Sequence, residues 1–179
     1  MADGADMTSR LVLVTGAARG LGVGICRQVL NQGVDVELLV AARTLGNAAE
    51  LVKSLHDPRA HAVQCDVTDE ASCRALAVEV AKLRRHRALS VVHNAGVAYD
   101  LPWFPAPWPS EAAKETLAVN FFGAQRLTEV LLPELLDEKA PGRLIFVSSG
   151  AGAANWSKMS EERRNELSLA DGPALMQLC

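Results

Sequence analysis

The sequence contains no block of basic residues and no apolar run long enough to cross a membrane. Its 179 residues carry a formal net charge of −3, and the main basic cluster spans residues 82–87. Nucleic acids and anionic membranes bind concentrated positive charge, so neither is expected as the main partner. A membrane span needs about 18 apolar residues in a row, and a secretory signal needs an apolar core near the N-terminus. We therefore expect a cytoplasmic protein, and we interpret residues 82–87 as a solvated helix end.

Paired cysteine motifs and metal-binding histidine motifs are also missing. The cysteines Cys26, Cys65, Cys73 and Cys179 form no Cys-x-x-Cys pair, and no two histidines have the spacing of metal ligands. This pattern favours neither a zinc site nor a disulfide framework. We therefore predict no metal, and we expect buried free thiols of the kind found in a reducing compartment.

A strand, a glycine-rich turn and a helix follow one another near the N-terminus. The apolar run 11–14 is typical of a buried parallel strand, the turn spans residues 15–22, and apolar residues then recur at helical spacing as far as Gln32. Backbone N–H groups at a helix N-terminus attract an anion such as a pyrophosphate, and glycine lets it approach. We expect a dinucleotide site here; the alternative is a turn that binds nothing. The residues assigned to this site are Gly16, Ala18, Arg19, Gly20, Leu21 and Gly22.

Strands and helices alternate along the rest of the sequence. Further strands are predicted over residues 34–42, 59–65, 89–93 and 143–149, and helices over residues 47–55, 70–85 and 110–136. This alternation predicts an α/β fold, a Rossmann-like doubly wound parallel sheet with helices on both faces. We expect a single domain over residues 1–179, with a core over 8–150 and an irregular or helical tail over 151–179 that includes a charged helix at 160–167.

Arg43 directly follows the second predicted strand. In a Rossmann unit the end of this strand faces the adenosine ribose, where a carboxylate binds a free 2′-hydroxyl and an arginine accepts a 2′-phosphate. Arg43, with Arg19 as a second cation, therefore predicts NADP(H) rather than NAD. The alternative is a surface arginine without a ligand. Asp66 ends the third strand on the same ligand-binding edge of the sheet.

Three motifs in this order resemble those of the short-chain dehydrogenase/reductase family. Thr15-Gly16-x-x-x-Gly20-x-Gly22 is similar to the family's cofactor loop, residues 66–67 to its adenine-contacting Asp motif, and residues 93–96 to its Asn-Asn-Ala-Gly motif. His93 replaces the first Asn of that motif, a departure that concerns the hydrogen bonds around the central strand. The resemblance adds to the cofactor-binding set Asp66, Val67, Asn94, Ala95 and Gly96.

The resemblance continues at two candidate catalytic residues, Asn120 and Ser149. Residues 120–123 and the polar stretch after Ser149 are most similar to the carbonyl reductase branch. This implies an NADP(H)-dependent oxidoreductase that transfers a hydride to a small-molecule ketone, aldehyde or quinone. In such an enzyme Ser149 would polarise the carbonyl oxygen and Asn120 would hold a proton-relay water.

The family's proton donor, a Tyr followed four residues later by a Lys, has no counterpart after Ser149. Tyr99, the one tyrosine of the sequence, has Trp103 four residues on. If residues 155–179 correspond to the insertion of the carbonyl reductases, the chain is expected to end before that Tyr and before the C-terminal strands. A complete protein of this branch is expected to be monomeric, whereas a truncated sheet would expose its fifth strand and favour association. The alternative function is thus a catalytically inactive truncated or spliced form that acts as a nucleotide-binding or interaction module.

Residues 102–109 combine alternating prolines with two tryptophans and a phenylalanine. The prolines restrict this stretch to extended conformations, and the aromatic side chains give it a large apolar surface. We expect it to pack onto the domain; the alternative is a wall over the nicotinamide.

Overall fold

The computed structural model describes residues 9–32, 35–85, 87–99 and 110–169. The chain divides into two compact units, Met1–Phe146 and Val147–Cys179. The proline- and tryptophan-rich stretch over 102–109 and Cys179 lie outside the described residues. None of the helices within the described ranges is long and apolar enough to span a bilayer.

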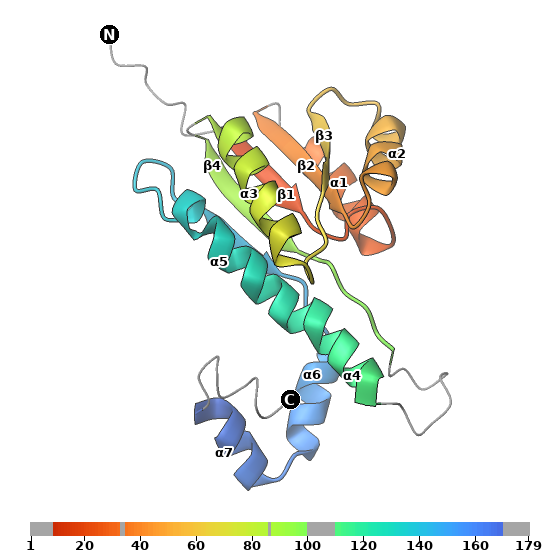
Figure 1. Ribbon diagram of the computed structural model, residues 1–179, viewed down its shortest axis with the longest axis vertical. Helices are drawn as coiled ribbons and strands as arrows, with labels where there is room; N and C mark the ends of the chain where they lie inside the picture. The colour runs from red at the N-terminus through yellow and green to blue at the C-terminus, as the bar shows by residue number, and fades with distance from the viewer. Residues whose placement is uncertain (1–8, 33–34, 86, 100–109, 170–179) are drawn as a thin grey trace. The chain divides into compact units, whose positions relative to one another are not determined.

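The first unit is built around a parallel sheet of five strands in the order β3-β2-β1-β4-β5 (Figure 1). The central strand β1 is apolar and buried, so it can pack on both faces of the sheet. The strand order changes direction between β1 and β4, which is where ligands bind in doubly wound folds. The strands are β1 Arg10–Val14, β2 Val36–Ala42, β3 Ala60–Gln64, β4 Ala88–His93 and β5 Arg143–Phe146.

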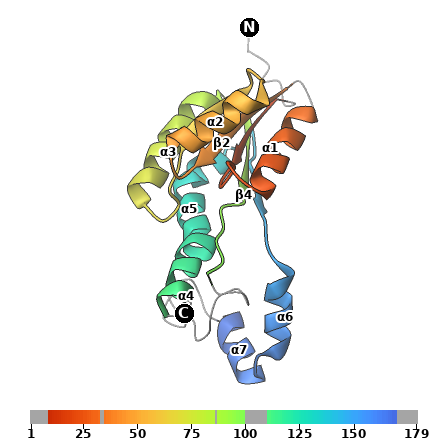
Figure 2. The same ribbon diagram turned by 90° about the vertical axis from the view of Figure 1, so that its right-hand side faces the viewer.

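Helices cover both faces of this sheet, as the alternating pattern predicted. Leu11 and Leu13 of β1 pack in a cluster with helices α3 and α5, while Val12 and Val14 pack on the other face with α1 and α2. Figure 2 shows α1 and α3 on opposite sides of the sheet. The helices are α1 Leu21–Asn31, α2 Leu45–Leu55, α3 Glu70–Arg84, α4 Ser110–Leu117 and α5 Ala124–Leu135. The predicted Rossmann-like fold is therefore confirmed.

The helix predicted over residues 110–136 is continuous but not regular. A π-helical segment, η1 Ala118–Gly123, lies between α4 and α5 and carries Asn120. Such segments are uncommon and often occur at functional sites. Gly123 ends this segment in close contact with Val67, because a Cβ on Gly123 would lie 2.7 Å from Val67 Cγ2. The apolar spacing of the sequence predicts the helix but does not reveal its π-helical segment.

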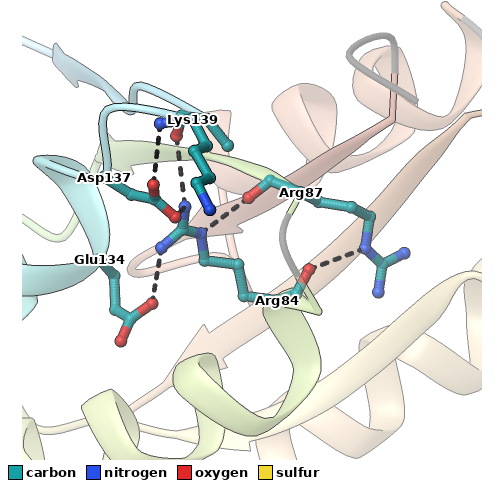
Figure 3. A network of polar contacts seen from close by, with 6 residues as sticks. Arg84, Arg87, Glu134, Asp137 and Lys139 are labelled. Atoms are coloured by element: carbon teal, nitrogen blue, oxygen red, sulfur yellow. Dashed lines mark hydrogen bonds and ion pairs between the residues drawn. The ribbon is translucent and has the colours of Figure 1, made fainter. Parts of the chain in front are cut away.

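The prediction of a solvated helix end over residues 82–87 is wrong for Arg84, which is only 5% exposed, whereas Lys82 and Arg85 are exposed. Its guanidinium lies 2.8 Å from Glu134 Oε2 and 2.7 Å from Asp137 Oδ2, and its Nε donates to the carbonyl of Arg87 at 2.7 Å (Figure 3). These bonds tie the end of α3 to the end of α5. The basic run could not reveal them because both carboxylates come from a distant part of the sequence.

Strand β5 forms one edge of the sheet and ends at Phe146, whereas we predicted a strand as far as Ser149. Its apolar side chains are exposed, with 45% of Ile145 and 57% of Phe146 accessible to solvent. The second unit contains α6 Gly150–Lys158 and α7 Glu161–Leu169. Helix α7 corresponds to the charged helix predicted at 160–167, whereas α6 falls in the part of the tail that we predict only as irregular or helical.

Candidate cofactor and catalytic site

The glycine-rich turn between β1 and α1 needs backbone conformations that other residues rarely adopt. Gly16 and Gly20 have φ angles of +59° and +55°. A Cβ on Gly16 would lie 2.7 Å from Ala95 Cα, so this glycine lets the turn pack against the end of β4. A Cβ on Gly20 would have no described atom within 4 Å. Gly20 therefore borders open space from which a ligand can approach the backbone.

No side chain among the described residues accepts a hydrogen bond from the first backbone N–H groups of α1. Its N-cap is Gly20, whereas Thr44 accepts from the N–H of Asn47 at the start of α2. Asp69 likewise accepts from two backbone N–H groups at the start of α3. An uncapped N-terminus beside an open turn leaves N–H donors and the positive end of the helix dipole for an anion. These residues fit the pyrophosphate of a dinucleotide.

Thr15 and Asn94 lock the carboxyl ends of β1 and β4 together. The Thr15 hydroxyl accepts from the backbone N–H groups of Asn94 and Ala95 at 3.1 and 3.0 Å. The Asn94 amide donates to the carbonyls of Thr15 and Gly16 at 3.0 and 3.1 Å. Thr15 opens the glycine-rich motif, but the motif alone predicts no role for its hydroxyl. A hydroxyl directly after a buried apolar strand was the signal that could have identified it.

Arg19 lies exposed in the turn between β1 and α1, and Arg43 lies exposed directly after β2, the strand that pairs with β1. The side-chain amide of Gln64 donates to the carbonyl of Arg43 at 3.3 Å and ties this residue to the end of β3. Within the described part of the chain, neither guanidinium forms an ion pair with a carboxylate. Both charges are thus available to an anionic ligand at this edge of the sheet.

Asp66 and Val67 form the turn that follows β3. Asp66 Oδ1 accepts from the N–H and the hydroxyl of Thr68 at 3.0 and 2.7 Å, which fixes the carboxylate. The Val67 carbonyl accepts from Arg126 Nη1 of α5 at 2.7 Å. Together with the contact between Val67 and Gly123, this bond joins the turn to the helix that carries Asn120.

The side chain of Asn120 is held by one neighbouring residue. Its Oδ1 accepts from the N–H of Val97 at 2.9 Å, and its Nδ2 donates to the carbonyl of Val97 at 2.8 Å. A Cβ on Gly96 would lie 3.5 Å from Asn120 Oδ1. The structure therefore brings the Asn120 side chain next to Gly96 and Val97, which follow β4.

Ser149 is the N-cap of α6, and its hydroxyl oxygen accepts from the N–H of Ala151 at 3.1 Å. It belongs to the second unit, whereas Asn120 belongs to the first. The catalytic pairing of these two residues stays a prediction from the sequence.

His93 is buried beside this site, at 5% exposure. Its Nε2 lies 3.1 Å from the Thr128 hydroxyl, and its ring stacks on Phe146 with centroids 4.8 Å apart. Burial lowers the pKa of His93 to about 4, so the ring is neutral at pH 7. Here a histidine in place of the family's asparagine links β4 to α5 and β5.

Comparison with known proteins agrees with this geometry. The family model described as short chain dehydrogenase matches residues 10–161. The chain belongs to the short-chain dehydrogenase family. Members of this family use a nicotinamide cofactor, NAD or NADP. Its relatives are dehydrogenases and reductases with various substrates.

Three similar proteins illustrate this range within the short-chain dehydrogenases. L-fucose dehydrogenase of Bos taurus is 34% identical over 164 residues, which cover 88% of this chain and 56% of that protein. Salutaridine reductase of Papaver bracteatum is 30% identical, covering 94% of this chain and 62% of that protein. The solved structure of salutaridine reductase from Papaver somniferum has a TM-score of 0.78 at 26% identity, covering 94% of this chain and 68% of that chain. The chain thus spans 56% and 62% of the length of the first two relatives.

Proposed function

We propose that this chain belongs to an NADP(H)-dependent oxidoreductase that reduces a small ketone, aldehyde or quinone. The observation that carries the proposal is the pair of exposed arginines, Arg19 and Arg43, beside the uncapped N-terminus of α1. A 2′-phosphate adds two negative charges to a dinucleotide, and these arginines offer matching positive charges at the edge where the ribose binds.

Each part of the site has a role in this proposal. Bound NADPH supplies the hydride. The turn at residues 16–22 holds the pyrophosphate, residues 66–67 contact the adenine, and residues 94–96 line the cofactor at the end of β4. Asn120 holds a proton-relay water, and the Ser149 hydroxyl donates to the carbonyl oxygen of the substrate. The similarity of residues 120–123 to the carbonyl reductase branch supports the substrate class.

One observation favours a second function, a nucleotide-binding or interaction module without catalysis. No Tyr-x-x-x-Lys follows Ser149 in the 179 residues, so the chain offers no counterpart to the family's proton donor. The exposed β5 edge supports association with another chain in this case, whereas a monomer is the expectation for a complete reductase. A cytoplasmic location remains a prediction from the sequence in both cases.

Separate measurements of binding and turnover distinguish the two functions. Calorimetric titration of the chain with NADPH and with NADH should show tighter binding of NADPH. Turnover is then measured with a panel of ketones, aldehydes and quinones. It is followed by the loss of absorbance of the reduced nicotinamide at about 340 nm. Binding with turnover supports the reductase, and binding without turnover supports the inactive module. Failure to bind either dinucleotide would contradict the reductase and the nucleotide-binding module, and would leave only the interaction module.

A further inference from the structure

Two contacts from the start of α5 fix Val67 in the turn that follows β3. Arg126 lies in the first turn of α5, and its Nη1 donates to the Val67 carbonyl at 2.7 Å. Gly123, three residues earlier, lies so close to Val67 that a Cβ on it would come within 2.7 Å of Val67 Cγ2. Gly123 is also the last residue of η1, the segment that carries Asn120. The turn and the segment with Asn120 are therefore attached to each other through Val67.

The Asp66 part of the same turn is held by its own neighbours in the sequence. The N–H of Asp66 donates to the Ser72 hydroxyl at 2.9 Å, and Thr68 donates twice to Asp66 Oδ1. The Val67 carbonyl takes its short hydrogen bond from Arg126, whereas the Cys73 thiol, a weak donor, lies 3.9 Å away. The direction of the Val67 carbonyl thus depends on α5 rather than on the turn itself.

The guanidinium of Arg126 is used differently from those of Arg84 and Arg87. Both of these arginines form ion pairs with carboxylates, Arg84 with Glu134 and Arg87 with Glu37. In the described part of the chain, no carboxylate lies at ion-pair distance from Arg126, and its described hydrogen bond goes to a backbone carbonyl. A charged donor makes a stronger hydrogen bond than a neutral one, so this bond holds the Val67 peptide firmly.

We propose that Arg126 is a positioning residue that holds the turn of Asp66 and Val67 at a fixed place relative to Asn120. The proposal rests on the proposed function, in which this turn contacts the adenine and Asn120 lies at the reacting end of the cofactor. A dinucleotide is bound at both of its ends, and it binds more tightly when the two sets of contacts are correctly spaced beforehand. Arg126 acts through Val67 and does not itself contact the ligand.

Arg126→Met tests this role because it removes the hydrogen bond and keeps most of the apolar stem. Calorimetric titration of the full chain uses NADPH and 2′,5′-ADP, which carries only the adenine end of NADPH. Both affinities should be about threefold to tenfold lower in Arg126→Met, as expected for the loss of one hydrogen bond. Arg126→Lys should restore both affinities, because a single nitrogen makes the bond and an ammonium can donate in its place.

Arg84→Met is the control for a purely structural effect, because it removes bonds to Glu134 and Asp137 at the opposite end of α5. It should lower the stability of the chain and leave the affinity for 2′,5′-ADP unchanged. Amide hydrogen exchange measures the turn directly and needs no ligand. Relative to the amides of β1, those of residues 66–68 should exchange faster in Arg126→Met than in the wild type, and at the wild-type rate in Arg84→Met.

Gly123→Ala tests the second contact, since its Cβ would push Val67 out of place. It should also weaken the binding of 2′,5′-ADP. Gly152→Ala is the matched control, because Gly152 lies exposed in α6 and a Cβ on it would have no described atom within 4 Å. This control should bind 2′,5′-ADP as the wild type does. Wild-type affinity in Gly123→Ala would contradict the requirement for a fixed Val67.

Unchanged affinities in Arg126→Met, or the same losses in Arg84→Met, would overturn the positioning role. Weaker binding in Arg126→Met without faster exchange at residues 66–68, or no recovery in Arg126→Lys, would overturn it too, because the guanidinium would then contact the ligand itself. If the wild type binds neither NADPH nor 2′,5′-ADP, the proposed function fails. The exchange rates of residues 66–68 still decide in that case whether Arg126 holds the turn.

Discussion

Glu134 Oε2 lies 2.8 Å from Nη1 of the buried Arg84, and this ion pair joins α5 to α3. Replacing the arginine in Arg84→Met would remove the bonds to Glu134 and Asp137 while keeping much of the apolar stem. We expect a loss of about 1.5–3 kcal/mol in the free energy of unfolding, the range for hydrogen bonds to charged groups. Urea denaturation measures this loss.

Arg74→Met is the matched control, because Arg74 pairs with Glu70 on the exposed face of the same helix. Exposed pairs of this spacing contribute only about 0.3–0.5 kcal/mol. Equal losses in the two variants would mean that the Arg84 network contributes no more than a surface pair.

Arg43→Gln tests the selectivity for NADP(H). Loss of a charge-assisted contact to the 2′-phosphate should weaken NADPH binding by about 1–3 kcal/mol and leave NADH binding nearly unchanged. Calorimetric titration with both dinucleotides measures the difference. Arg27→Gln removes an exposed arginine from α1 and should change neither affinity. Equal losses for NADPH and NADH in Arg43→Gln would show that this side chain does not reach the 2′-phosphate.

His93 predicts a pH dependence of stability. Its pKa is about 4 in the folded chain and about 6.5 when unfolded, so the unfolded chain binds the proton first as pH falls. The neutral histidine therefore favours folding above about pH 6.5, and this advantage is lost progressively between about pH 6.5 and 4. The loss amounts to at most about 3 kcal/mol.

His93→Asn should flatten this pH dependence, as measured by urea denaturation at several pH values between about 6.5 and 4. His56→Asn replaces an exposed histidine with a left-handed backbone, which asparagine tolerates, and should retain the slope of the wild type. The same slope in His93→Asn and in the wild type would assign the pH dependence to other groups.

Ser149 is expected to act on the carbonyl oxygen of the substrate, in any form of the protein that turns over. Ser149→Ala should lower kcat by about 10²-fold to 10³-fold with little change in NADPH affinity, because it removes a donor used in the transition state. Ser149 also caps α6, so Ser149→Ala should in addition lower the free energy of unfolding by about 1 kcal/mol. Stability must therefore be measured together with activity.

Ser149→Asp separates the two effects. An aspartate keeps an acceptor for the N–H of Ala151 but has no hydrogen to donate when ionised. It should retain the stability of the cap and still lose turnover, whereas Ser149→Thr should restore both. Normal turnover in Ser149→Ala would contradict the assignment.

The sheet could be predicted because its strands are short apolar runs, such as Leu11–Val14, separated by helical stretches. The glycine-rich turn could be predicted because it separates an apolar run from a stretch with helical spacing, and β1 and α1 flank it in the structure. Contacts between distant elements could not. Arg84 resembles its exposed neighbours in the sequence, and only the fold brings Glu134 to it. The stacking of His93 on Phe146 likewise depends on the pairing of β4 with β5.

Element ends were harder to predict than element cores. The apolar spacing predicts a helix that starts at residue 47, but Thr44 is the N-cap and α2 begins at Leu45. The exposed Leu45 and Gly46 do not follow the apolar spacing that guided the prediction. The apolar run also predicts a fifth strand that reaches Ser149, but Ser149 is the N-cap of α6. The same apolar run can precede a longer strand or a helix cap, so it does not show where the strand ends.

The uncapped N-terminus of α1 also has a consequence for the stability of the chain. An anion that binds at an uncapped helix end accepts hydrogen bonds from its unpaired N–H groups. Because this anion binds only the folded chain, its binding free energy adds to the stability of the fold. A ligand present at about 100 times its Kd adds about 2.7 kcal/mol to the folded state. If the ligand is a dinucleotide, the amount of folded chain in a cell rises and falls with the dinucleotide supply.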